Sequence, residues 1–127
     1  MIDKNLILIK YLQGLTNDYI FKSEYSTNDK NLKVVVVSVR PTEKEVLFSG
    51  KKLFDAFQIE IFGDSIRSEK DLAVTIGELI GDNVTIEYEG KNYQIMFQQI
   101  SNPQSIMYED IRRVGYTLIL RTLINEI

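Results

Sequence analysis

Cysteine and histidine are both absent from this chain of 127 residues, and only two prolines and seven glycines occur. Without cysteine the chain forms no disulfide, no thiolate metal site and no cysteine nucleophile, and its composition fits folding in a reducing cytoplasm. Without histidine it lacks the usual general base near neutral pH and the commonest metal ligand. Any catalysis would have to use carboxylates, lysines, tyrosines or serines, so the composition disfavours an enzyme.

Long apolar runs and an excess of positive charge are missing as well. No run approaches the ~20 apolar residues that a membrane-spanning helix requires, and no signal peptide is visible. Fifteen basic and eighteen acidic residues give a net charge of −3 and a pI near 5.0, whereas phosphate binding needs clustered Lys and Arg. The remaining composition, 44% hydrophobic and 26% charged, is typical of a globular protein, and we expect one domain over residues 1–127.

Two segments have apolar residues at helical spacing. They cover residues 2–15 and residues 68–80, and each has an apolar stripe that a sheet can bury. We expect Ser68 and Asp71 to form a capping box at the start of the second helix. Gly81 follows the stripe, and we expect it to end this helix as a C-cap.

The other periodic segments alternate with a period of two, as half-buried strands do. They cover residues 18–25, 34–39, 57–62, 84–88, 93–97 and 115–124. Glu89 and Gly90 predict a tight turn that joins two of these strands in a hairpin, because glycine adopts a positive φ at little cost. We therefore expect an α+β fold, in which a mostly antiparallel sheet has two helices packed on one face.

The connection over residues 42–50 contains consecutive apolar residues that should not be exposed to water. Val46, Leu47 and Phe48 stand there, and Lys51 and Lys52 follow. This segment forms either a short extra strand folded onto the sheet or a projecting arm. As a hypothesis, these five residues contact a neighbouring subunit.

Residues 101–110 are predicted as a second, turn-rich connection, and they pose the same choice. Ile106, Met107 and Tyr108 lie in it, and methionine and tyrosine are common at interfaces. These three side chains either contact a partner protein or tuck over the core of their own chain. The hypothesis adopted is the partner contact.

No group of residues has the spacing of a catalytic, cofactor-binding or metal site, and none is expected. Asp82 followed by Glu89 and Lys91 has the residue types of some metal-dependent nucleases. Gly90 between them predicts a turn that directs both side chains into solvent, which disfavours that reading. The other acidic residues are scattered along the sequence, without the spacing of a paired-acid site or a calcium loop. The glycines are also dispersed, so no phosphate-binding loop is indicated.

The order of the elements resembles that of phage tail terminators. The matching features are the strand at 57–62 with Gly63 leading to a helix, and the stretch from Pro103 to Arg113 ahead of Tyr116. More narrowly, the chain is similar to the small minor capsid proteins of long-tailed phages and prophages of Gram-positive bacteria. The resemblance covers nearly the full length, and it is a pattern of elements without a catalytic signature.

This resemblance implies a tail-terminator-like fold and a non-enzymatic structural protein of the virion. Copies would form a ring, by analogy a hexamer, that caps the tail tube, ends its polymerisation and helps to join tail to head. The implied partners are other copies, the tail tube protein and a head-completion or stopper protein, with no membrane and no nucleic acid. The implied location is the tail or neck of the virion, and the host cytoplasm during assembly.

Two alternatives remain open. One, which departures from the family's pattern leave possible, is another adaptor of the neck or of head completion. The other, of a different class, is a small ligand-binding or enzymatic α+β domain, which would need a concave pocket with convergent polar groups.

Overall fold

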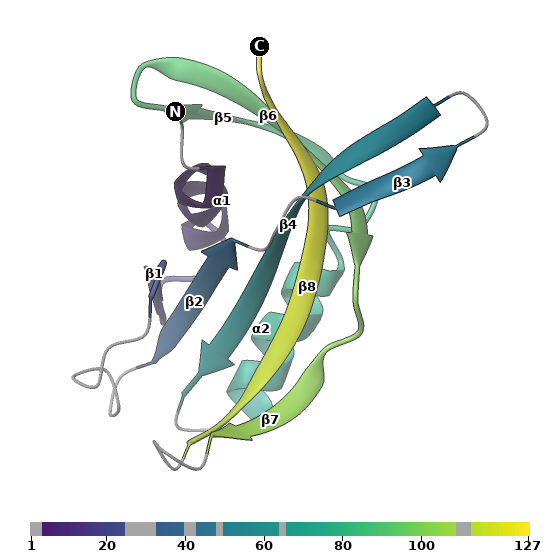
Figure 1. Cartoon of the computed structure of the whole chain (residues 1–127). Coiled ribbons are helices and arrows are strands. Elements are labelled where there is room, and N and C mark those ends of the chain that lie inside the picture. The colour runs from purple at the N-terminus through teal and green to yellow at the C-terminus, as the bar shows by residue number, and fades with distance from the viewer. Residues whose placement is uncertain (1–3, 25–32, 40–42, 48–49, 64–65, 109–112) are drawn as a thin grey trace.

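The computed structural model of the chain describes residues 4–24, 33–39, 43–47, 50–63, 66–108 and 113–127. For residues 43–47, 50–54, 66–68, 106–108 and 113–114 it describes the backbone alone. The elements follow in the order α1 (Lys4–Gln13), β1 (Ile20–Lys22), β2 (Val34–Val39), β3 (Glu43–Leu47), β4 (Gly50–Phe62), α2 (Ile66–Gly77), β5 (Asn83–Tyr88), β6 (Lys91–Ile100), β7 (Gln104–Tyr108) and β8 (Arg113–Glu126). The fold is therefore α+β, with a curled and mostly antiparallel sheet and two helices (Figure 1).

The two longest strands, β4 and β8, lie side by side at the centre of the sheet. The strand order is β1-β2-β4-β8-β6-β5, with β3 beside β4 and β7 beside β8. Every pairing is antiparallel except the parallel pairing of β1 with β2. Each central strand thus has a neighbour in two pieces, because β2 and then β3 run along β4, and β6 and then β7 run along β8.

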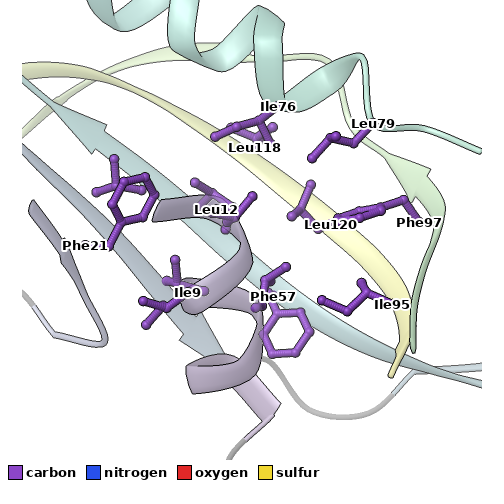
Figure 2. Close-up of a cluster of buried hydrophobic side chains, with 14 of the residues drawn as sticks. Ile9, Leu12, Phe21, Phe57, Ile76, Leu79, Ile95, Phe97, Leu118 and Leu120 are labelled. Atoms are coloured by element: carbon purple, nitrogen blue, oxygen red, sulfur yellow. The ribbon is translucent and has the colours of Figure 1, made fainter. Parts of the chain in front are cut away.

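Both helices pack against the same face of the sheet, as predicted, and the main core lies between the two layers. Figure 2 shows Ile76 of α2 and Leu79 of the turn that follows it next to Leu118 and Leu120 of β8, with Leu12 of α1 in the same cluster. Fully burying a side chain of this kind contributes about 1.5–3 kcal/mol, so this cluster is the main source of stability.

The register of the central strands puts apolar residues from each on the helix-covered face. Phe57 pairs with Leu120 and Ile59 pairs with Leu118, and all four are buried in the core. Phe62, which broke the alternation in the sequence, lies on the opposite face. There it forms a second buried cluster with Val34 and Val36. Strand β2 is therefore buried on both faces, which accounts for its continuous run of valines.

The hairpin of β5 and β6 agrees with the prediction from Glu89 and Gly90. Val84 pairs with Ile95 and Ile86 pairs with Tyr93, while Tyr88 and Lys91 close the two-residue turn. Glu89 has a φ of 50° and Gly90 a φ of 80°, as a type I′ turn requires. The local turn signal thus set the register of the whole hairpin.

The predicted ends of the second helix are wrong at both termini. Helix α2 begins at Ile66, so Ser68 and Asp71 lie inside it and do not form a capping box. It ends at Gly77, and residues 78–80 continue as turns instead of α-helix. Gly81 has the expected left-handed φ of 83°, and its N–H donates to the carbonyl oxygen of Phe97 at 2.8 Å. The segment after α2 is therefore hydrogen-bonded to β6, a contact that no local sequence pattern predicts.

Candidate functional site

The sheet divides into two ribbons at Asp55. Strand β4 pairs with β8 from Phe62 down to Asp55, and over residues 50–54 its described partner is β3. Strand β8 pairs with β6 on its other edge from Leu120 to Glu126, so beyond Thr122 its described partner is β6 alone. We name β3 together with residues 50–54 the arm. The second ribbon consists of residues 123–126, β5 and the part of β6 that pairs with them. Figure 1 shows the arm leaving the sheet on one side and the hairpin of β5 and β6 extending to the other.

The side chain of Asp55 holds the point where the ribbons part. One of its carboxylate oxygens accepts the backbone N–H of Ile124 at 3.2 Å and lies 3.1 Å from the ammonium group of Lys4. Its backbone carbonyl accepts the hydroxyl of Thr122 at 3.1 Å. The carboxylate thus replaces the strand that would have paired with β8 at Ile124, and hydrogen bonds to a charged acceptor are stronger than neutral ones.

Asp55 was missed by sequence reasoning, although a signal was present. It has the same parity as Phe57 and Ile59, so it stands on the face that the helices cover. An acid in an apolar row is unusual because a buried charge needs a partner. Here the partners come from the two ends of the chain, Lys4 and Ile124, which no local pattern connects.

The predicted subunit-contact residues stand in the arm. Val46 pairs with Lys51, Glu45 with Lys52 and Leu47 with Gly50, so the segment predicted as a connection contains strand β3. Among the described residues β3 pairs with β4 and with no other strand, which corresponds to the projecting alternative. Phe48 lies outside the described residues. The backbone therefore brings Val46, Leu47, Lys51 and Lys52 into one hairpin.

The predicted partner-contact residues Ile106, Met107 and Tyr108 stand in a strand, so the prediction of a turn-rich connection is wrong. Strand β7 pairs with β8 from Gln104 to Tyr108, and Ile106 is opposite Gly115. The neighbouring Pro103 and the short length of β7 concealed it, because five residues give too little alternation to identify a strand. Residues 109–112 of the resembling stretch lie outside the described part.

The arm and β7 occupy opposite ends of the central strand pair. The arm begins next to Asp55 and Thr122, whereas β7 is in register with Gly115, the partner of Phe62. Seven residue steps at about 3.3 Å separate Asp55 from Phe62, or roughly 23 Å along the strand. The two predicted contact segments therefore cannot form one patch on a single copy.

The residues that suggested a nuclease lie at the two ends of β5. Glu89 occupies the first turn position, and Lys91 forms an exposed ion pair of 3.3 Å with Glu126. Asp82 lies at the start of the hairpin, and its carbonyl accepts the N–H of Phe97 at 3.0 Å. Because Glu89 and Lys91 lie at the opposite end of β5 from Asp82, these three side chains do not form a shared site.

A surface hollow of about 270 Å³ lies between α2, the connection from α1 to β1, and Lys33 just before β2. Asp18, Tyr19, Lys33 and Asp71 are among its lining residues, and the ammonium group of Lys33 lies 5.3 Å from the centre of the Tyr19 ring. Pockets for small molecules are usually about 300–1,000 Å³ and mostly apolar. This hollow is smaller and lined by charged surface groups, so it gives little support to a ligand-binding domain.

Comparisons with models of protein families, with curated proteins and with solved structures found no match to this chain. Within the part of the chain that the structure describes, no three acids converge as a metal site would need. No helix among the described residues has the length and apolar character to cross a bilayer.

Proposed function

We propose that this chain is a non-enzymatic structural protein of a phage virion, a tail terminator of the minor capsid protein type. In this proposal copies close into a ring, by analogy a hexamer, on the end of the tail tube. The ring stops polymerisation of the tube and presents a face to the head-completion or stopper protein. The protein would assemble in the host cytoplasm and reside in the neck of the virion.

The observation that carries the proposal is the arm. A two-stranded hairpin is at best marginally stable in water by itself, and the described strands of the arm pair only with each other. Contact with a neighbouring copy would stabilise it, because that copy would cover its apolar residues and its unpaired strand edges. The apolar sequence of Val46, Leu47 and Phe48 supports this role.

The separation of the arm from β7 also supports a ring. A head-to-tail contact joins two different patches, and repetition of such a contact closes into a ring when the rotation per copy allows it. The arm at one end of the central strands provides one patch, leaving β7 at the other end for a different partner. Ile106, Met107 and Tyr108 are proposed to contact the tail tube protein or the head-completion protein.

Light scattering of the purified protein over a concentration series tests this proposal, with the tail tube protein of the same genome added in a second series. We expect a particle of ring size in at least one series. A strict monomer in both series would contradict the ring and would favour a neck adaptor or a ligand-binding domain instead.

Substituting Phe48→Glu tests the arm as the subunit contact. We expect loss of the ring, because a charged side chain would have to be desolvated in the contact. Ile80→Glu is the matched control, since Ile80 is 54% exposed on the turn after α2 and lies outside the arm. A ring that survives Phe48→Glu as well as Ile80→Glu would remove the arm from the contact.

A further inference from the structure

Strand β5 ends the strand order of the sheet, and no described strand pairs with its outer edge. The N–H of Phe97 donates to the carbonyl of Asp82, and in an antiparallel pair such bonded positions recur at every second residue. The backbone groups of Val84, Ile86 and Tyr88 therefore point toward β6. Those of the alternate residues, Asn83, Thr85 and Glu87, point outward, and the side chains of these three are exposed.

Among the described residues, this edge has none of four features that often protect an edge strand from pairing with another strand. These features are proline, lysine, a bulge and a very short length. Strand β5 has six residues, none of them proline or lysine, and it pairs with β6 without a register shift. The strand is also held firmly, because Val84, Ile86 and Tyr88 pack against the main core.

Residues 50–54 of the arm have β3 on one edge and no described strand on the other, because their pairing with β8 ends at Asp55. Their sequence includes Lys51 and Lys52, and Glu45 of β3 is opposite Lys52. Strand β5 carries the exposed acid Glu87, and the exposed Glu89 follows it in the turn. Opposite charges on two unpaired edges favour their pairing and fix its direction of approach.

The positions of the two edges point to pairing between copies. In Figure 1 the arm extends away from β5 of its own chain, on the other side of the sheet division. An arm that reaches outward on one side of a copy and an open edge on the opposite side suit a head-to-tail contact.

We propose that β5 receives the arm of a second copy, whose residues 50–54 add as a strand beside Asn83, Thr85 and Glu87. Pairing of backbone groups would supply the affinity, and the lysines of the arm near Glu87 would set the register. This inference rests on the proposed ring and names the surface that receives the arm.

The absence of cysteine from the chain allows a direct crosslinking test. Lys51→Cys and Lys52→Cys are each combined with a cysteine at Asn83, Thr85 or Glu87, and the full-length variants are oxidised under the conditions that favour assembly. Neighbouring residues of a strand face opposite sides, so one of the two arm thiols must lie on the side of the β5 side chains. The control combines Lys10→Cys, at an exposed position of α1, with the same β5 cysteines.

We expect at least one arm variant to form a ladder of crosslinked copies that reduction removes, and the Lys10 controls to form none. Ring-sized particles without such a ladder would overturn the β5 contact and leave the ring itself standing. Monomers in every condition, with no ladder, would overturn both proposals.

Charge reversal gives a second measurement that does not depend on thiol geometry. We expect Glu87→Lys to weaken self-association about tenfold, because like charges would meet across the contact. Adding Lys51→Glu and Lys52→Glu to the same chain should restore most of the affinity. Glu78→Lys is the control, since Glu78 is an exposed acid on the turn after α2. Equal affinities for Glu87→Lys and Glu78→Lys would contradict the assigned role of Glu87.

Discussion

Gly115 of β8 lies close against the backbone of β4, and its substitution by alanine should destabilise the protein. A Cβ at this position would overlap the carbonyl oxygen of Ile61 and would lie 3.3 Å from Cδ1 of Phe62. The overlap involves backbone, so no side-chain rotation relieves it and the two strands must move apart. Gly115 is itself buried and is also paired with Ile106 of β7, which leaves little room for that movement.

The size of the effect follows from two opposing contributions. Forcing an extra methyl group into a packed site costs about 1–3 kcal/mol, and the backbone overlap places Gly115→Ala at the upper end. Alanine restricts the unfolded chain more than glycine does, which offsets about 0.5–1 kcal/mol. We therefore expect a net loss of about 2 kcal/mol in the free energy of unfolding, and a Tm lowered by about 8 °C for a domain of this size.

Urea unfolding followed by far-ultraviolet circular dichroism measures this loss, and Gly77→Ala is the matched control. Gly77 is the last residue of α2, and a Cβ added there would meet no atom within 4 Å. The control should be stabilised by about 0.5–1 kcal/mol, because alanine is the better helix former. A Gly115→Ala variant as stable as the native chain would refute the close approach of β4 and β8.

Two further predictions concern β7 and the branch point, which is the place at Asp55 where the sheet divides into two ribbons. Asp55→Ala should cost about 2 kcal/mol, because it leaves the N–H of Ile124 without its charged acceptor, whereas Lys4→Ala should cost less than about 1 kcal/mol, because the ion pair is partly exposed. Urea unfolding of both variants and the exchange rate of the Ile124 amide measure this difference, and equal losses would mean that the ion pair, not the hydrogen bond, stabilises the branch point. Tyr108→Ala should abolish joining of tail to head in an assembly assay while leaving the ring intact, and Gln104→Ala, at an exposed position of the same strand, should leave joining unchanged. Intact joining with Tyr108→Ala would exclude Tyr108 from the partner contact.

Where local patterns were strong, the sequence predicted the fold well. Three predictions depended only on neighbouring residues, and the structure agrees with all of them. They are the strand of valines in β2, the alternation of Phe57 and Ile59 in β4, and the turn at Gly90. The predicted start and end of α2 were wrong, because the termini of a helix also depend on contacts with residues outside it. The hydrogen bond from Gly81 to Phe97 is such a contact.

The candidate site was predicted only in part. The apolar residues of the two connections marked the segments of interest. A short extra strand was one of the two alternatives for residues 42–50, whereas β7 was not predicted as a strand. Each strand has five residues and pairs with the longer strand that follows it, β4 or β8. Five residues give too little alternation to identify a strand from local periodicity.

By itself the sequence determined the fold class, the two apolar helix stripes, most of the strands and the hairpin register, because each of these follows from side-chain spacing and turn chemistry over a few neighbouring residues. The tertiary structure alone decided where the sheet divides. That division requires Asp55 to meet Lys4, Thr122 and Ile124, residues that lie more than fifty positions away in the chain. The arm and the open edge of β5 are consequences of strand pairing, and pairing between distant segments is set by the packing of the whole sheet.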